Sequence, residues 1–358
     1  MNGTGLHDPL KQYVYVLECG DGSLYTGYAT DVEARLAAHR AGRGARYTRA
    51  HEPVRLLAQA RFYSKRRAMS AEAYFKRLAR TEKGRLLALA EHEPFEDVLR
   101  RELPGFGDDT ASEFVCRSLA GCVDAGYRAF IASLIPGVDP CRIVGVRTPE
   151  LRRIARELMR RGDASGFLEG LPHQLFEEMQ VHAFAIGLIR DYDAALARIE
   201  AFLPHVDNWA TCDQLPVHVL EKRPDETLVH VEHWLESGHC YIMRLAIRVL
   251  MAQFLAERFD SCFLDDVAGA RLLVGTGGGS SVRGEVPPAQ SDAYYLNIMR
   301  AWYFAEAVVR QPGAALPYLE RRGADALLDE WTRRKAIQKA VESRRVPAEL
   351  KEHLRSCR

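Results

Sequence analysis

Apolar and polar side chains alternate along the first part of the chain, in short runs that end at turn residues. A period of two is typical of half-buried strands, and Gly20-Asp21-Gly22 between the first two runs is a hairpin signal. Thr30, with Glu33 three residues later, matches a capping box at a helix start. The pattern predicts strands over 12–18, 22–27 and 54–62, then helices over 65–79 and 83–91. We place a small α+β domain at residues 1–91.

From residue 113 onward the alternation disappears, and amphipathic segments of helical length follow one another. Thr148 before Pro149 predicts a helix start, because proline fits the first helical position. The later predicted helices cover about 174–190, 192–203, 208–221, 225–236, 240–258, 291–310, 313–320 and 325–342. Successive helices with short polar breaks predict an all-α, HEAT-like solenoid over 113–358. The expected fold class is therefore multidomain: a small α+β domain followed by this solenoid.

Two segments interrupt this order. Residues 92–112 are rich in proline, glycine and acidic residues, and we predict a linker there. Residues 270–290 contain the run Gly275-Thr276-Gly277-Gly278-Gly279-Ser280-Ser281, which we interpret as part of a flexible insertion. The alternative is a phosphate-binding loop, but the preceding strand and the following Lys-Ser or Lys-Thr pair of such a loop are missing.

The composition is that of an ordinary globular protein: 47% of the 358 residues are hydrophobic and 27% are charged. The sequence has no run of 18 apolar residues, and MNGTGLHDPLKQ at its start has no apolar core, so we expect neither a membrane span nor a signal peptide. Eight cysteines without CxxC pairs argue against disulfides and structural zinc. We expect a bacterial cytoplasmic protein that associates with the nucleoid while it acts.

The net charge of +1 conceals an asymmetry. Residues 1–90 carry 16 Lys and Arg against 8 Asp and Glu, whereas the remainder carries 33 against 40. A small domain this basic favours a polyanionic partner, and nucleic acid is the usual one. The acidic remainder needs a local basic face to bind DNA. The residues that we expect to contact DNA are Arg46 and Lys76 in the first domain and Arg147, Arg152, Arg333 and Lys335 in the second.

Several residues whose side chains could take part in catalysis lie in the first domain. Tyr13-Val14-Tyr15 and, after the turn, Tyr25-Thr26-Gly27 are followed by Arg35, His39 and Glu72. This set resembles the GIY-YIG nuclease pattern, and most closely that of the small single-domain bacterial GIY-YIG proteins. The sequence departs from the pattern at Tyr13, where the family has glycine. It also has no asparagine between residues 3 and 207, although many members carry one after the glutamate.

These residue types suit phosphodiester hydrolysis. Glu72 can hold one Mg²⁺, which needs only one or two carboxylates and keeps several waters. Arg35 offers a bidentate fork to phosphate oxygens, and His39, one turn later at an expected exposed position, can contact phosphate from the same helix face. The hydroxyls of Tyr15 and Tyr25 can face one site from paired strands, and the resemblance implies that one of the two activates water. The alternative is that both tyrosines are packing residues.

A second constellation lies in the helical part. Trp209 and Asp213 are four residues apart, so an indole and a carboxylate share one helix face, with Asp207 as the expected N-cap. Arg244 and Trp302 follow on later helices. Together with the helical pattern, these residues resemble the HEAT-repeat DNA alkylation repair glycosylases (the AlkD-like family) over roughly 120–355. The resemblance implies an alkylated duplex as partner and no cofactor for this part.

The chemistry of such a site is simple. Alkylation at N3 or N7 makes a purine cationic and a good leaving group, so a fixed carboxylate can stabilise the oxocarbenium-like sugar that remains. We assign this role to Asp213, with water as the nucleophile. Trp209 and Trp302 offer their faces to a cation or a deoxyribose, and Arg244 is expected to grip a backbone phosphate. The alternative is a structural carboxylate beside packed tryptophans.

The two halves together predict a DNA repair enzyme. Its helical part would hydrolyse the N-glycosidic bond of N3- or N7-alkylated purines, and its first domain would cut a phosphodiester with Mg²⁺. One alternative is a non-catalytic DNA-binding or protein-binding scaffold with a degenerate nuclease domain, and another is an RNA-directed nuclease. Double-stranded, alkylated DNA is the expected partner, and we expect neither a membrane nor a small-molecule cofactor to take part.

Overall fold

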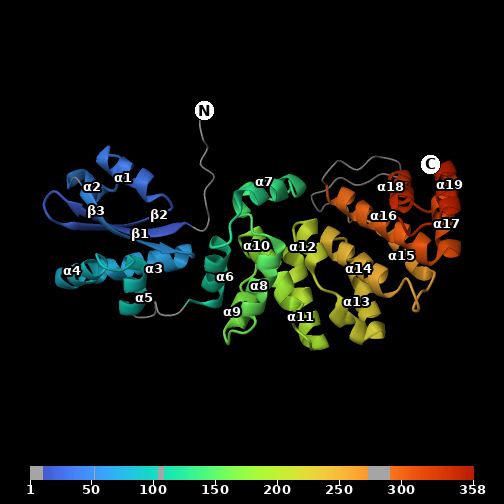
Figure 1. Cartoon of the computed structure of the whole chain (residues 1–358), viewed down its shortest axis with the longest axis horizontal. Helices are drawn as coiled ribbons and strands as arrows, with labels where there is room; N and C mark the ends of the chain where they lie inside the picture. The colour runs from blue at the N-terminus through green and yellow to red at the C-terminus, as the bar shows by residue number, and fades with distance from the viewer. Residues whose placement is uncertain (1–10, 52, 104–108, 273–290) are drawn as a thin grey trace. The chain divides into compact units, whose positions relative to one another are not determined.

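The alternating segments near the N-terminus form a three-stranded antiparallel sheet in the computed structural model, which describes residues 11–51, 53–103, 109–272 and 291–358 (Figure 1). The strands β1 (Gln12–Cys19), β2 (Leu24–Ala29) and β3 (Pro53–Phe62) lie in the order β2-β1-β3. This arrangement confirms the α+β prediction. Because Tyr15 pairs with Gly27 in the register of β1 and β2, the two tyrosine motifs lie opposite each other.

Helices cover both faces of this sheet. Helices α1 (Val32–Arg40) and α2 (Arg46–Ala50) lie on one face, whereas α3 (Lys65–Arg77), α4 (Arg80–Leu89) and α5 (Phe95–Glu102) lie on the other (Figure 1). Alternate side chains of β1 therefore enter two cores: Val14 packs in the core that α3 and α5 complete, and Tyr15 packs in the core that α1 completes. Helix α1 begins one residue later than predicted, because the carboxylate of Asp31, not Thr30, accepts from the N–H of Ala34.

The prediction of a linker over 92–112 is wrong for its first half. Phe95, Val98 and Leu99 of α5 are buried in the same core as β1 and α3. Their spacing of three and four residues makes one apolar helical stripe, which outweighs the acidic composition around it. The first domain therefore continues through Leu103, which is also buried in that core.

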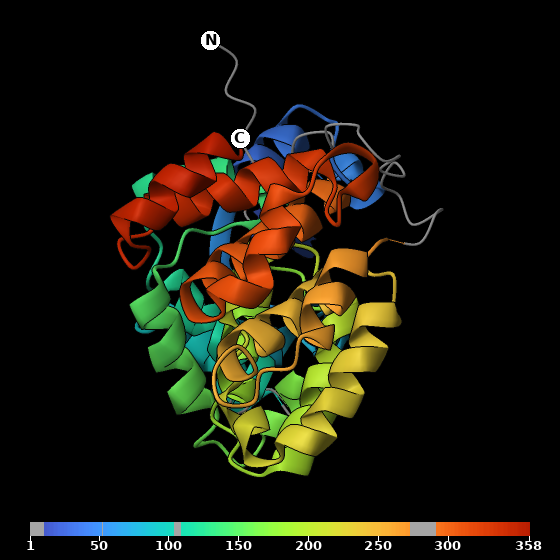
Figure 2. The ribbon, with the colours of Figure 1, turned by 90° about the vertical axis from the view of Figure 1, so that its right-hand side faces the viewer.

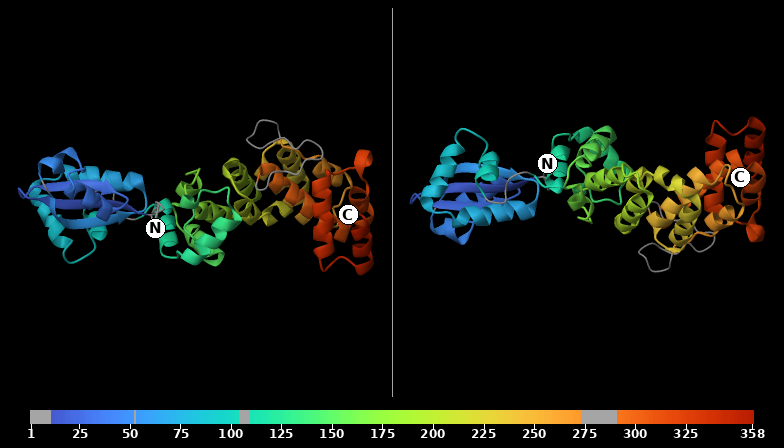
Figure 3. Two further views of the ribbon diagram at one scale, coloured as in Figure 1. Left: turned by 90° about the horizontal axis from the view of Figure 1, so that it is seen from above. Right: turned by 90° about the horizontal axis from the view of Figure 1, so that it is seen from below.

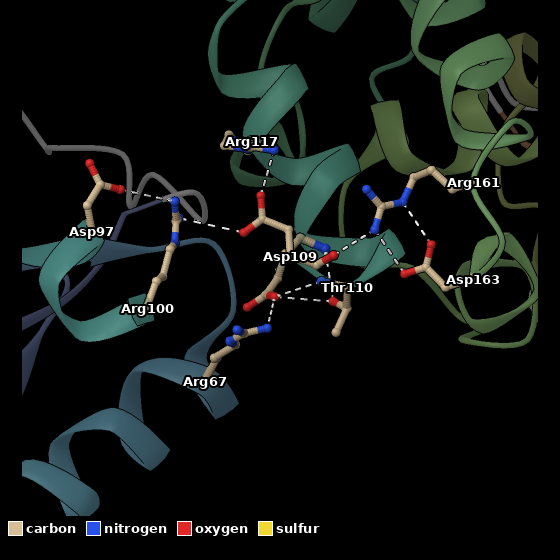
Figure 4. A network of polar contacts seen from close by, with 9 residues as sticks. Arg67, Asp97, Arg100, Asp109, Thr110, Arg117, Arg161 and Asp163 are labelled. Carbon is tan, nitrogen blue, oxygen red and sulfur yellow. Dashed lines mark hydrogen bonds and ion pairs between the residues drawn. The ribbon is translucent and has the colours of Figure 1, made fainter. Parts of the chain in front are cut away.

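Ion pairs connect this domain to the first helix of the following region, α6 (Ala111–Ala120) (Figure 4). The guanidinium of Arg67 on α3 donates to Glu113 on α6, and both side chains are largely buried. Asp109 binds Arg117 on α6 at 2.7 Å and Arg100 on α5 at 3.6 Å. The junction is therefore a charged contact between packed elements.

Helices alone follow Asp109 in the described part of the chain, which confirms the all-helical prediction. The predicted helix over 208–221 is broken at Pro216, and its N-cap is Asn208, not Asp207, because the Asn208 side chain accepts from the N–H of Thr211. Most of the predicted insertion, from 273 to 290, lies outside the described residues. After α6 the helices are α7 (Ala125–Leu134), α8 (Thr148–Leu158), α9 (Ala164–Leu168), α10 (Phe176–Ile186), α11 (Tyr192–Phe202), α12 (Trp209–Gln214), α13 (Pro224–Glu236), α14 (Cys240–Gln253), α15 (Cys262–Gly269), α16 (Asp292–Arg310), α17 (Pro312–Glu320), α18 (Glu330–Glu342) and α19 (Ala348–Ser356).

The chain divides into two compact units, one of residues 1–134 and 139–182 and the other of residues 135–138 and 183–358. In the second unit, α12 contacts α14, α14 contacts α16, and α16 contacts α18. Figure 2 shows this unit with α16–α19 nearest the viewer, and both views of Figure 3 show its segments in chain order from yellow to red. We call the four neighbouring helices α12, α14, α16 and α18 the helix row. None of the described helices is long and apolar enough to cross a bilayer.

Candidate active sites in the sheet domain and in the helix row

Four residues predicted for the nuclease-like site come together on the α1 side of the sheet. The hydroxyl of Tyr15 lies 2.9 Å from Nε2 of His39. The ring centroid of Tyr25 lies 6.2 Å from that of Tyr15 and 5.2 Å from that of His39. The guanidinium of Arg35 lies beside both tyrosines. Among the described residues it forms no ion pair, and its Nε is buried without a hydrogen-bond partner.

A hydrogen-bond chain sets the tautomer of His39. The Thr48 hydroxyl donates to the carbonyl oxygen of Ala45 at 3.0 Å, so its oxygen must accept from Nδ1–H of His39 at 2.6 Å. Nε2 of the neutral ring then carries a lone pair, and the Tyr15 hydroxyl donates to it. The prediction that His39 is exposed is wrong, because both it and Tyr15 are only 1% exposed.

Burial controls the protonation of this pair. It raises the pKa of Tyr15 to about 12, although the neighbouring Arg35 guanidinium acts in the opposite direction. Burial, and then the positive charge of Arg35, lower the pKa of His39 below its ordinary value. At neutral pH both groups are therefore uncharged. Tyr25 and Arg35 are the members of this group that remain partly exposed.

Two glycines make the close approach possible. A Cβ built on Gly27 would overlap the hydroxyl of Tyr15, and a Cβ on Gly44 would overlap Nδ1 of His39 and crowd Thr48. Any side chain at either position must displace the hydrogen-bonded chain. The glycine of Tyr25-Thr26-Gly27 thus has a packing reason within this site.

In the second unit, Asp213 and Arg244 form a bidentate ion pair within the helix row. Nε and Nη2 of Arg244 donate to the two carboxylate oxygens of Asp213 at 2.9 and 2.7 Å, and Nη1 donates to the carbonyl oxygen of Tyr295 at 2.8 Å. The side chain of Arg244 is 2% exposed, whereas that of Asp213 is 20% exposed. The prediction that Arg244 grips a DNA phosphate is wrong, because its guanidinium is buried and engaged; it holds the carboxylate instead.

The predicted tryptophans belong to the same row. Trp209, on α12 with Asp213, is partly exposed, and Trp302 on α16 is 40% exposed. The ammonium of Lys339, on α18, lies 4.5 Å from the ring centroid of Trp302. The helix row therefore carries a fixed carboxylate and accessible indoles on neighbouring helices.

Comparisons with known proteins match the sheet domain and the helical part separately. A model of the GIY-YIG catalytic domain matches residues 11–86, and a model of the DNA alkylation repair enzymes matches residues 119–266. A UPF0213 protein of Streptococcus sanguinis is 66% identical over 73 residues, which are 20% of this chain and 84% of that protein. A UPF0213 protein of Streptococcus pneumoniae is 56% identical over 78 residues, 22% of this chain and 79% of that protein. The chain belongs to the GIY-YIG family and joins to it a DNA alkylation repair domain.

The comparisons also found a solved structure with a similar sequence. The solution NMR structure of the UPF0213 protein BH0048 from Bacillus halodurans is 44% identical, covers 26% of this chain and 96% of that chain, and has a TM-score of 0.17. Both matched family models describe enzymes, and together a nuclease domain and an alkylation repair domain support a role in DNA repair.

The predicted metal residue of the GIY-YIG domain lies on α3. Glu72 continues the buried stripe of Ala68, Ala71 and Phe75, and its side chain is 17% exposed. Its Oε1 accepts from Lys76 at 2.7 Å. Lys76, one of the predicted DNA contacts, is thus engaged with Glu72, and Arg46 on α2 is exposed. Among the described residues, no group of three or more His, Cys, Asp and Glu side chains is arranged to hold a metal ion.

The predicted DNA contacts of the helical part differ in exposure. Arg147 is 62% exposed and pairs with Asp124, and Arg152 is also exposed. Lys335 is partly exposed and donates to Gln338. The prediction for Arg333 is wrong: its side chain is 1% exposed and binds Glu330 and two backbone carbonyl oxygens. It links α18 to the segments around Leu319 and Cys357.

Several residues of these sites were missed from the sequence. Thr48 and Gly44 could be found only through their contacts with His39, because neither belongs to the tyrosine motifs. Tyr47 was missed although it is 43% exposed and stacks 6.3 Å from Tyr25.

Proposed function

We propose that the alkylation repair domain hydrolyses the N-glycosidic bond of N3- or N7-alkylated purines in duplex DNA. The observation that carries the proposal is the Asp213 carboxylate, which a buried arginine orients from behind while one-fifth of its side chain stays exposed. A carboxylate held in this way costs no reorganisation when positive charge develops on a nearby sugar. The alkylated purine is already a cation, so no general acid is needed for its departure.

Arg244 supports this chemistry as a positioning residue. Its two hydrogen bonds to Asp213 fix the plane of the carboxylate. Aromatic faces are supplied by Trp209, on the same helix as Asp213, and by Trp302 on α16. Such faces attract a cationic base or pack against deoxyribose, each contact contributing ~0.5–2 kcal/mol.

We further propose that the GIY-YIG domain cleaves a DNA phosphodiester. Support comes from the Arg35 guanidinium, whose buried Nε lacks a partner in the described chain and is suited to a phosphate oxygen. Tyr25 lies at the partly exposed side of the same cluster, above the buried Tyr15–His39 pair. This placement favours Tyr25 over Tyr15 as the tyrosine that contacts the attacking water or the phosphate.

The donor set fits Mg²⁺ with few protein ligands. Glu72 has one carboxylate oxygen on Lys76, and the other has no partner among the described residues. Mg²⁺ bound there would keep waters and share the substrate phosphate, where it would neutralise charge on the phosphate and its leaving group. Base removal and strand cutting would then act in sequence on one lesion.

A duplex with a single 7-methylguanine tests the glycosylase proposal. The full chain in EDTA is expected to release the base, and Asp213→Asn is expected to reduce the rate by at least ~100-fold, as removal of one stabilising group does elsewhere. Asp207→Asn is the matched control, because Asp207 lies in the same segment outside the helix and should leave the rate unchanged. Equal rates for Asp213→Asn and the wild type would refute the assignment.

An abasic duplex tests the nuclease proposal separately. Nicking is expected with Mg²⁺ and should disappear in Glu72→Gln, whereas Glu82→Gln, a surface change on α4, should retain it. Binding of DNA without any base release or nicking in the wild type would instead establish the non-catalytic scaffold.

A further inference from the structure

Lys339 lies on α18 with its ammonium against the ring of Trp302 on α16. Among the described residues, no hydrogen bond or ion pair engages its ammonium; its contact is the face of Trp302 at 4.5 Å. Lysines on a protein surface are normally solvated or paired. A partly buried lysine whose ammonium lies over an indole and has no hydrogen-bond partner in the described chain is therefore a candidate for a chemical role.

The two side chains border a hollow of about 470 Å³ in the second unit. Its lining includes two carboxylates, Glu306 and Glu342, and both already accept from other side chains: Glu306 from Arg310 and Arg345, and Glu342 from Gln338. The hollow is of a size that accommodates a small ligand such as a sugar. Both carboxylate oxygens of Glu306 therefore have cationic partners, whereas the ammonium of Lys339 has no hydrogen-bond partner among the described residues.

The surroundings of Lys339 favour the uncharged amine. Partial burial lowers its pKa, and the positive charges of Lys335 and Arg244 act in the same direction, against Glu342. Desolvation and a neighbouring cation are the two established ways to make a lysine nucleophilic at neutral pH.

We propose that Lys339 gives the alkylation repair domain a second, metal-independent activity: an abasic-site lyase whose amine attacks the deoxyribose that base removal leaves behind. This inference rests on the proposed action of the domain on DNA. It adds a substrate, the ring-opened abasic deoxyribose with its C1′ aldehyde, and a nucleophile on α18.

The reaction balances without an oxidant or reductant. The Nζ lone pair adds to the C1′ carbonyl carbon, and loss of one water with uptake of one proton from solvent gives a protonated imine. Water takes the C2′ proton, the C–H electron pair forms the C2′–C3′ double bond, and the C3′–O bond breaks with its electrons leaving on the 3′ phosphate. One water then hydrolyses the imine and returns Lys339. The strand is cut on the 3′ side with an unsaturated aldehyde at the new end.

Borohydride trapping tests the proposal on an abasic duplex prepared beforehand, so the test does not depend on base removal by this protein. The full chain in EDTA with borohydride is expected to form a covalent adduct, because reduction of the imine leaves a stable amine. Peptide mapping of the wild-type adduct should place the DNA on Lys339. Lys339→Arg keeps the charge but cannot form the imine, so it should lose both the adduct and the β-elimination product. Lys351→Arg, on α19, is the matched control and should retain both.

Absence of an adduct in the wild type, or an adduct mapped to another residue, would overturn the proposal. An adduct of undiminished yield in Lys339→Arg would also overturn it. If the wild type formed no adduct and Lys339→Arg lost DNA binding, Lys339 would instead be a phosphate contact. Release of 7-methylguanine is scored in a separate assay. An adduct without base release would refute the proposed glycosylase alone, and base release without an adduct would refute the lyase alone.

Discussion

Replacing Arg244 with methionine removes the group that holds Asp213 while keeping a long apolar side chain in place. Arg244 makes two hydrogen bonds to the carboxylate and one to the carbonyl oxygen of Tyr295. The substitution leaves a partly buried carboxylate without its partner and a carbonyl oxygen without its donor. Both losses destabilise the second unit, because neither group can be fully rehydrated inside the fold.

The magnitude follows from the burial of the pair. Removing one partner of a buried ion pair costs ~3–5 kcal/mol. Asp213 is 20% exposed and can recover part of its hydration, so the lower end, ~3 kcal/mol, is appropriate. With a urea m-value of ~2–3 kcal/mol per M, the midpoint of unfolding should fall by ~1–1.5 M.

Tryptophan fluorescence during urea titration measures this quantity for the second unit alone, because all four tryptophans (Trp209, Trp234, Trp302 and Trp331) lie in it. Arg334→Met is the control: Arg334 is 67% exposed in its pair with Glu330, so its loss should cost ~0–1 kcal/mol. A midpoint for Arg244→Met within ~0.3 M of the wild type would refute the structural role that we assign to the pair.

Three further predictions concern both sites. Thr48→Val should reduce nicking by about tenfold, the effect of one lost hydrogen bond of ~1.4 kcal/mol, and Thr48→Ser should restore it; equal rates for all three proteins would contradict the tautomer assignment. Gly44→Ala should destabilise the GIY-YIG domain by at least ~1 kcal/mol because its Cβ overlaps His39, whereas Gly84→Ala, in open space on α4, should stabilise it by ~0.5–1 kcal/mol, as hydrogen exchange can measure. Arg333 and Arg334 lower the pKa of Glu330 to about 2, so the stability from this carboxylate is complete above its ordinary pKa near 4.5 and disappears as the pH falls toward 2; Glu330→Gln should flatten the midpoint-against-pH curve in that range.

Local patterns were sufficient to predict most elements of the fold. The alternation along Gln12–Cys19 and the turn at Gly22 predict the hairpin, because neighbouring residues determine both. Helix α5 was missed because it has only two turns, begins after Pro94 and carries five charged residues in Phe95–Glu102, of which Glu96, Asp97 and Arg100 are examples. Its place is set by the core that Phe95 and Leu99 enter, which no short segment of sequence contains.

For the predicted site residues too, local spacing was sufficient for some features and tertiary contacts decided the others. Spacing placed Trp209 and Asp213 on one helix, and contact between α12, α14 and α16 brings Arg244 and Trp302 into the same row. Spacing also placed Arg35 and His39 on one helix, but it predicted His39 to be exposed. Thr48 and Tyr15, nine and 24 residues away, make it a buried hydrogen-bonded group.

The order of residues along this chain was enough to predict its change from sheet to helices, because that change depends on periods of two and of 3.6 residues. The two family resemblances came from short motifs, which the sequence also contains. The working state of each charged group depends on the folded structure. Arg244, Arg333 and Lys339 all have cationic side chains, yet their roles differ. Arg244 orients a carboxylate, Arg333 links segments of the backbone, and Lys339 has no ion pair in the described chain. Burial and the partners supplied by distant segments separate these roles, because the free energy of a charge depends on everything that surrounds it in space.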